Sequence, residues 1–116
     1  MELKKICETL KKGSAELALQ NATTKNKALS AVAKALDSKR DEILSANKKD
    51  IENAKANGIS AALIDRLTLD SKRINGIIES LNIVISQADP VGEEISGWKT
   101  PNGLNIRQVR VPLGVV

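Results

Sequence analysis

The sequence predicts an α/β fold: a mostly α-helical portion, then a C-terminal β-hairpin arm, then the start of a parallel-sheet strand. Up to Asp89-Pro90, apolar residues recur at the spacing of amphipathic helices. After Pro90, short strand-like runs flank Asn102-Gly103, which is a strong hairpin signal. The apolar run 112–116 follows and fits a strand that is covered on both faces.

The first helix is predicted near the N-terminus and should end at Gln20-Asn21. A second, longer helix is predicted from an N-cap at Thr23 to a stop at Asn57-Gly58. The apolar positions of the first helix are Leu3, Ile6, Cys7, Leu10, Leu17 and Ala18. Those of the second helix are Leu29, Val32, Ala33, Leu36, Ile43, Leu44, Ile51 and Ala54.

Two polar residues, Arg40 and Asn47, fall on or beside the apolar stripe of the second helix. A buried polar group without a hydrogen-bond partner costs about 1–3 kcal/mol, so each must find one. We expect Arg40 to snorkel outward along its aliphatic stem and Asn47 to bond the backbone of a neighbouring loop. Both are predicted to hold the fold together and not to bind a ligand.

Two further helices are predicted before the hairpin. Ser60 can cap a short helical turn that contains the charged pair Asp65-Arg66. Asp70 can cap a third substantial helix, which should end at Asp89-Pro90 because proline disfavours helical geometry in the residue before it. The apolar face of this last helix is the clearest in the chain and consists of Ile74, Ile77, Ile78, Leu81, Val84 and Ile85.

The hairpin strands are predicted at residues 95–99 and 104–111. The second strand alternates imperfectly, because its apolar residues are even-numbered at 104 and 106 but odd-numbered at 109 and 111. This slip indicates either a bulge or twist near Arg107-Gln108, or a strand that is partly covered on both faces where it meets another subunit. Pro112 has no amide proton and marks a sheet edge or a change of sheet.

Composition limits the classes of function. The 116 residues suffice for one modest domain, and 41% of them are apolar, with a single Trp and no Phe or Tyr. No apolar stretch is long enough to span a bilayer, and the N-terminus does not resemble a secretory signal, so we expect no membrane partner. One cysteine cannot form an internal disulfide, which fits a cytoplasmic location.

The basic residues are not predicted to bind nucleic acid. The net charge of +4 arises from 18 basic and 14 acidic side chains, and the acids are interleaved with the lysine pairs. No aromatic residue lies near those pairs to stack on a base. The pairs are therefore interpreted as solvated helix faces, and RNA binding through phosphate neutralisation is the weakest of the hypotheses considered.

The chain has almost no residues that could perform catalysis. It has no histidine and a single cysteine, so it lacks the usual general base and any thiolate zinc site. Its glycines match no phosphate-binding loop. Lys4 and Lys11 lie at helical spacing from Cys7, but Cys7 sits in an apolar stripe and is predicted to be a small structural residue. No catalytic, cofactor-binding or metal-binding residue is predicted in this chain.

The order of the short motifs is more specific than the inventory. The series is Asn47-Lys48-Lys49-Asp50, Ala54, Asn57-Gly58, Asp65-Arg66-Leu67, Leu69, Arg73, Asp89-Pro90-Val91-Gly92 and Val111-Pro112-Leu113-Gly114-Val115. Over almost the whole chain, this series resembles the N-terminal portion of γ-glutamyl phosphate reductase, also called glutamate-5-semialdehyde dehydrogenase, in the aldehyde dehydrogenase superfamily. Asn-x-x-Asp and Pro-Leu-Gly-Val are shared across that superfamily. The combination with Asp-Arg-Leu and Asp-Pro-Val-Gly is specific to the family.

The resemblance implies the activity of the whole enzyme. It is the NADPH-dependent reduction of L-glutamyl 5-phosphate to L-glutamate 5-semialdehyde, a step of proline biosynthesis. The family's catalytic cysteine forms a thioacyl-enzyme and lies far downstream, so Cys7 does not match it. NADPH is expected to bind the full-length family member and not this portion alone.

The resemblance also implies an organisation and a set of partners. Residues 1–90 would pack on the cofactor-binding domain, residues 91–111 would form an oligomerisation arm, and residues 112–116 would begin a truncated dinucleotide-binding domain. The chain is thus expected to be the front end of a longer polypeptide that forms a homo-oligomer. Asn47, Asp50 and the Asp65-Arg66 pair carry over as structural clamps. The alternative is a free-standing helical interaction module without catalysis.

Overall fold

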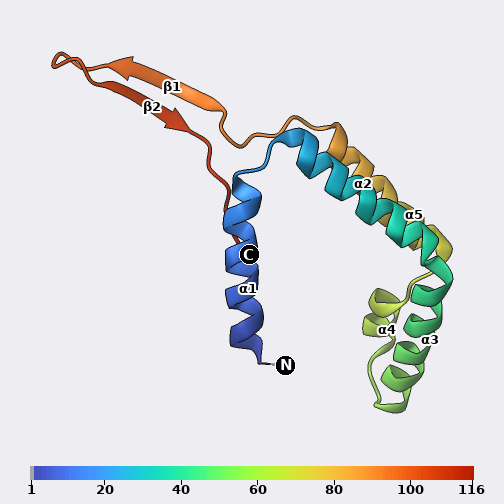
Figure 1. The fold of residues 1–116 in the computed structure, drawn as a ribbon. Coiled ribbons are helices and arrows are strands. Elements are labelled where there is room, and N and C mark those ends of the chain that lie inside the picture. Colours follow the sequence, from blue (N-terminus) through green and yellow to red (C-terminus); the bar gives the residue numbers. More distant parts are fainter. Residues whose placement is uncertain (1) are drawn as a thin grey trace. The chain divides into compact units, whose positions relative to one another are not determined.

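The computed structural model describes residues 2–116, which form two compact units. One unit comprises residues 26–87, and the other comprises the residues up to 25 together with 88–116. Within the described residues the structure has five helices and one two-stranded antiparallel sheet (Figure 1). The helices are α1 (Leu3–Ala18), α2 (Ala22–Ser38), α3 (Arg40–Ala56), α4 (Ala61–Leu67) and α5 (Ser71–Ser86), and the strands are β1 (Glu94–Lys99) and β2 (Asn105–Val109).

Helix α1 confirms the first predicted helix and ends just before Gln20-Asn21. No residue of α1 is buried, although its apolar residues share one face. Cys7 is exposed in this structure, and its predicted structural role stays a prediction. The residue is exposed because the apolar face of α1 is not covered.

The single long helix predicted from Thr23 to Asn57 is two helices. α2 begins at Ala22, where the Asn21 side-chain oxygen accepts a hydrogen bond from the Thr24 amide at 2.9 Å, so Thr23 is not the N-cap. The helical path breaks at Lys39, whose φ is −102° and ψ is 16°. α3 then ends at Ala56 as predicted, and Gly58 has a positive φ of 69° that suits a helix stop.

Helices α4 and α5 follow the sequence prediction closely. Asp70 caps α5, because its Oδ1 accepts a hydrogen bond from the Arg73 amide at 2.6 Å. Ser60 occupies the N-cap position of α4, but its side chain makes no capping hydrogen bond. α5 ends at Ser86, shortly before the predicted Asp89-Pro90 stop.

The helices of residues 26–87 are held by few buried apolar side chains. α2 and α5 lie side by side and antiparallel (Figure 1). Accordingly, the Asn26 side-chain nitrogen near the start of α2 donates to the Ile85 carbonyl near the end of α5. Among the described residues, the buried apolar side chains are those of Ala33 and Ile74, which are 7% and 1% exposed. This core is small for a chain with so many amphipathic helices.

The hairpin confirms the predicted turn and both strands, although β2 ends at Val109 and not at residue 111. Its loop comprises residues 101–103, and Gly103 has a φ of 91°, which favours glycine. The Thr100 amide donates to the Leu104 carbonyl at 2.9 Å and closes the loop. A bulge is present close to the predicted position at Arg107-Gln108, but the extra residue belongs to β1 and not to β2. Glu94 pairs with Val109 and Ser96 with Gln108, so Ile95 of β1 is the extra residue.

Residues 110–116 form no strand in the structure. Arg110 still hydrogen-bonds the backbone of Gly92 and Glu93, but within residues 2–116 no backbone hydrogen bond joins residues 111–116 to a neighbouring segment, and a strand exists only through such pairing. The strand predicted at 112–116 is therefore absent here. None of the helices of the described chain combines the length and the apolar character that crossing a membrane requires.

Candidate functional site

Arg40 links three helices of the 26–87 unit. Its guanidinium donates to the Ser71 carbonyl at 3.0 Å, to Asn75 Oδ1 at 2.6 Å and to Asp37 Oδ1 at 2.7 Å. The side chain is 22% exposed, so the prediction that Arg40 snorkels into solvent is wrong. The guanidinium turns toward α5 because its fixed fork of donors finds acceptors there. These contacts join the break between α2 and α3 to the first turns of α5.

Asn47 hydrogen-bonds the backbone of a neighbouring loop, as its position on the apolar stripe predicts. Its side-chain nitrogen donates to the Leu67 carbonyl at 2.9 Å, and its oxygen accepts from the Leu69 amide at 2.8 Å. The residue is 8% exposed, and both ends of its amide are paired. Asn47 therefore holds the loop between α4 and α5 against α3, which confirms the predicted role of a structural clamp.

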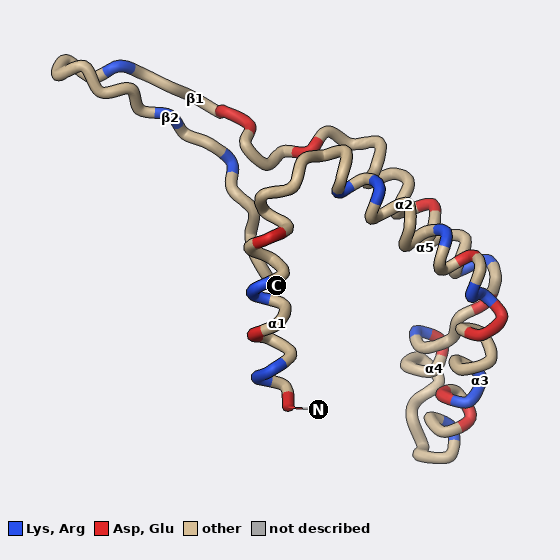
Figure 2. The backbone as a smooth tube through the Cα atoms, viewed as in Figure 1, with Lys and Arg blue, Asp and Glu red and all other residues tan. Residues whose placement is uncertain are grey.

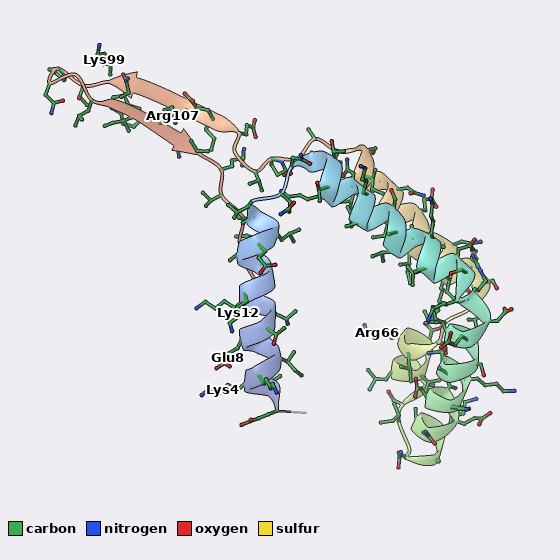
Figure 3. The ribbon with its side chains drawn as sticks, in the orientation of Figure 1. Lys4, Glu8, Lys12, Arg66, Lys99 and Arg107 are labelled. Carbon is green, nitrogen blue, oxygen red and sulfur yellow. The ribbon has the colours of Figure 1, made fainter. Side chains whose placement is uncertain are left out.

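The other predicted clamps divide into two groups. Asp65 pairs with Arg73 at 2.8 Å, and the Arg73 guanidinium also donates to the Asp65 and Thr68 carbonyls. Asp50 and Arg66 are exposed, and no side-chain hydrogen bond of residues 2–116 involves either of them. Figure 3 shows Arg66 projecting from α4. Arg73 is thus the arginine that clamps this region, and sequence reasoning assigned the role to Arg66 instead.

A groove of about 540 Å³ lies between α2 and α5. Its polar lining includes Lys34, Asp37 and Glu79 besides the paired Arg40 and Asn75. Charges of both signs alternate there, and Figure 2 shows the same interleaving along the helices. Such a lining attracts neither an anion nor a cation strongly.

The two faces of the hairpin carry different side chains near its turn. The register places Trp98 opposite Ile106 on one face, and Leu104 follows on the same side. Trp98 is 55% exposed and Leu104 is 59% exposed. The other face carries Glu94 and Arg107, whose side chains lie 3.7 Å apart. Figure 3 labels Arg107 and the neighbouring Lys99.

Helix α1 has a charged side next to its uncovered apolar residues. Lys4, Glu8 and Lys12 project from the same side of the helix (Figure 3). A shallow depression beside them is lined by Glu8, Lys11, Lys12 and Ala15. Opposite charges one helical turn apart stabilise a solvated helix by about 0.2–0.5 kcal/mol per pair. This side of α1 is an ordinary solvated surface.

An ion pair joins the start of α2 to the segment before the hairpin. Lys25 Nζ lies 2.6 Å from Asp89 Oδ2, and each side chain is 21% exposed. Asp89 Oδ1 also accepts the Val91 amide at 3.0 Å. The Lys25 ammonium, followed by the Val91 amide, holds the pKa of the Asp89 carboxyl below its ordinary value. Sequence reasoning used Asp89 as a helix stop and as part of the Asp-Pro-Val-Gly motif, and it did not predict this ion pair.

Comparisons with known proteins agree on one family. The chain is 45% identical over 115 residues to the gamma-glutamyl phosphate reductase of Thermobifida fusca, and 54% identical over 106 residues to that of Lachnospira eligens. The crystal structure of the gamma-glutamyl phosphate reductase from Thermotoga maritima superposes with a TM-score of 0.89 at 40% identity and covers 97% of this chain. No family model matches the sequence.

The chain matches the γ-glutamyl phosphate reductases. The alignments span 99% and 91% of the chain but only 28% and 26% of the two γ-glutamyl phosphate reductases named above. The chain thus spans about a quarter of the length of these relatives. The γ-glutamyl phosphate reductase of Saccharomyces cerevisiae superposes with a TM-score of 0.86 at 26% identity, so the mostly helical architecture with a two-stranded sheet matches solved members.

The name γ-glutamyl phosphate reductase implies a nicotinamide cofactor for the full-length relatives. Binding of the pyrophosphate of a dinucleotide uses a glycine-rich turn between a strand and a helix. Within residues 2–116, both strands follow the last helix, so no such turn exists. Nor does this part of the chain contain a group of three or more side chains that could hold a metal ion. That no residue of this chain binds the cofactor stays a prediction.

Proposed function

We propose that this chain is the N-terminal portion of a γ-glutamyl phosphate reductase and that its role in the enzyme is structural. The observation that carries the proposal is the small core. The helices are amphipathic, yet Ala33 and Ile74 are the buried apolar residues of the described chain. Apolar surface of this extent is stabilised by burial against other protein, at about 25 cal/mol per Å² removed from water. The remainder of the same polypeptide is the natural partner for it.

The whole enzyme is proposed to reduce L-glutamyl 5-phosphate to L-glutamate 5-semialdehyde with NADPH, in the proline pathway of the cytoplasm. In this reaction the acyl–phosphate bond breaks, phosphate leaves, and a hydride from NADPH is added to the carbonyl carbon. The support is the similarity to proteins named gamma-glutamyl phosphate reductase over nearly the full chain. The catalytic cysteine and the cofactor site are placed outside residues 1–116.

We assign a role to each segment in this proposal. Residues 1–90 pack on a cofactor-binding domain of the aldehyde dehydrogenase type, and residues 112–116 become its first strand. Residues 91–111 form an arm that contacts a second subunit. Support comes from the hairpin itself, because every residue of β1 and β2 is exposed. An isolated two-stranded hairpin is only marginally stable in water, so the arm needs a protein surface to cover it.

The alternative, a free-standing helical interaction module, requires a core of its own. A chain of this size needs enough buried apolar area to offset the conformational entropy of folding. The two buried apolar residues do not provide it. The structure therefore favours the enzyme-portion proposal over the module.

A chimera tests the proposal. The matched segment of the Thermobifida fusca enzyme is exchanged for this chain, which is 45% identical to it. We expect the chimera to oxidise glutamate 5-semialdehyde in the presence of NADP and phosphate. The 116-residue polypeptide alone should show no turnover, and the T. fusca enzyme with the segment deleted is the matched control.

Two results would contradict the proposal. Turnover by the short polypeptide at a rate comparable to the chimera would place the chemistry within residues 1–116. A chimera that assembles like the parent enzyme but is inactive would refute the assigned role. A monodisperse 116-residue polypeptide that unfolds cooperatively would support the module instead.

A further inference from the structure

The chain passes between its two units at two places, after Lys25 and after Gln87. Next to these two places, each unit contains one contact between residues that are far apart in sequence. On one side Lys25 Nζ lies 2.6 Å from Asp89 Oδ2. On the other side Asn26 Nδ2 donates to the Ile85 carbonyl at 3.4 Å. The Asn26–Ile85 bond thus joins the two ends of the 26–87 unit, and the Lys25–Asp89 pair joins two distant segments within the other unit.

Asp89 also contacts the hairpin stem, which comprises residues 91–93 and Arg110. One carboxylate oxygen accepts from Lys25, and the other accepts from the Val91 amide at 3.0 Å. The next residues along the chain continue the bonding, because the Gly92 amide donates to the Arg110 carbonyl at 2.9 Å. The Arg110 amide returns a hydrogen bond to the Glu93 carbonyl, also at 2.9 Å. A continuous series of hydrogen bonds therefore runs from the first turn of α2 to the hairpin stem.

The Lys25–Asp89 pair differs from the other ion pairs of the described chain. Its two side chains are each 21% exposed, whereas every other pair has at least one side chain that is more than half exposed. Its partners are also the farthest apart in sequence, at 64 positions. Shielding from solvent reduces screening by salt, so this pair is the one expected to have a measurable effect.

We propose that the Lys25–Asp89 ion pair is a latch that fastens the hairpin stem to the first turn of α2. With the latch closed, the stem amides and the capped start of α2 are protected together. With the latch open, both become free to exchange with solvent. The inference goes beyond the proposed function, because it does not depend on what the hairpin contacts or on any catalytic activity.

A double-mutant cycle in the full-length gene product tests the latch by amide hydrogen exchange. Lys25→Met keeps the apolar stem of lysine without the charge, and Asp89→Asn keeps an oxygen for the Val91 amide. We expect each variant to speed exchange at the Gly92 amide about fivefold, which is the effect of losing a weak ion pair. The double variant should be no faster than the faster single variant, because both substitutions break the same contact.

A second probe and a control make the test specific. The Thr24 amide donates to the capping oxygen of Asn21, and its exchange should speed up together with that of the Gly92 amide. Asp65→Asn breaks the Asp65–Arg73 pair instead and should leave the Gly92 and Thr24 amides unchanged. Additive effects of the two latch substitutions, or a Thr24 amide that does not respond, would overturn the inference. Should Asp89→Asn fail to fold, Lys25→Met alone decides, and an unchanged Gly92 amide in that variant refutes the latch.

Discussion

The guanidinium of Arg40 donates a hydrogen bond to the side-chain oxygen of Asn75 at 2.6 Å, which fastens the break between α2 and α3 to α5. The same group reaches the Ser71 carbonyl and Asp37. The guanidinium donates from two separate nitrogens, Nη1 to Ser71 and Nη2 to Asp37 and Asn75, whereas the three donors of a lysine ammonium all lie on one nitrogen. Arg40, the first residue of α3, thus ties the break at Lys39 to both neighbouring helices.

Arg40→Lys should lower the free energy of unfolding of the 26–87 unit by about 1 kcal/mol, because lysine cannot reproduce the forked contacts. Urea denaturation of the full-length gene product measures this free energy, and hydrogen exchange of the α5 amides assigns the change to the 26–87 unit. Arg66→Lys is the matched control, since Arg66 is exposed and should have an effect near zero. Equal effects of the two substitutions would show that the Arg40 contacts do not stabilise the unit.

Asn47→Ala should cost about 1–3 kcal/mol, because it leaves the Leu67 carbonyl and the Leu69 amide without their partner. The loss should appear as faster hydrogen exchange at the Leu69 amide. Asn53→Ala, at an exposed position of the same helix, is the control and should leave that amide unchanged. Protection of the Leu69 amide in Asn47→Ala would contradict the clamp.

Asp70→Ala should destabilise α5 by about 1 kcal/mol, because the Arg73 amide loses its capping oxygen. Ser60→Ala at the corresponding position of α4 should cost much less, since the Ser60 side chain makes no capping bond. Thermal or denaturant unfolding of both variants gives the comparison. A larger loss from Ser60 than from Asp70 would mean that the caps are assigned to the wrong helices.

Gly103→Ala should destabilise the hairpin by about 1–2 kcal/mol, because Gly103 has a φ of 91°. Gly103→Asn should cost less, since asparagine enters the left-handed region more readily than alanine. The Thr100 amide, which closes the loop onto Leu104, reports the change by hydrogen exchange. Identical effects of Ala and Asn would exclude backbone strain as the cause.

Protection of the hairpin stem should depend on pH through Asp89. The pKa of Asp89 lies below its ordinary value of 3.8 because of Lys25, so its carboxylate stabilises the fold above that value. The contribution is lost as pH falls through the lowered pKa. Exchange at the Gly92 amide, corrected for the intrinsic rate, should therefore be flat near neutral pH and accelerate below about pH 4.

Asp89→Asn separates this effect from general acid unfolding. The variant has no carboxyl to titrate, so the acid-dependent difference between the Gly92 amide and amides in α5 should disappear. Asp65→Asn should retain that difference. Wild-type stem exchange that follows α5 throughout the acid range would show that Asp89 does not control the stem.

Local features of the fold were predictable because they depend on neighbours in sequence. The cap at Asp70 and the stop at Asn57-Gly58 are satisfied within one helical turn. The hairpin turn at Asn102-Gly103 depends on the backbone freedom of a single glycine. Asn47 was also predictable, since a polar residue on an apolar stripe must bond something nearby.

The sequence by itself determined which stretches become helices and strands, where most of them end, and which family the motif order resembles, because all of these depend on short spacings. Only the tertiary structure decided that the second helix breaks before Arg40, that the extra residue of the hairpin is Ile95, and that Asp89 meets Lys25. Each of these depends on an acceptor, a strand register or a charge contributed by a distant part of the chain. Such partners become neighbours only after folding, so no periodicity records them.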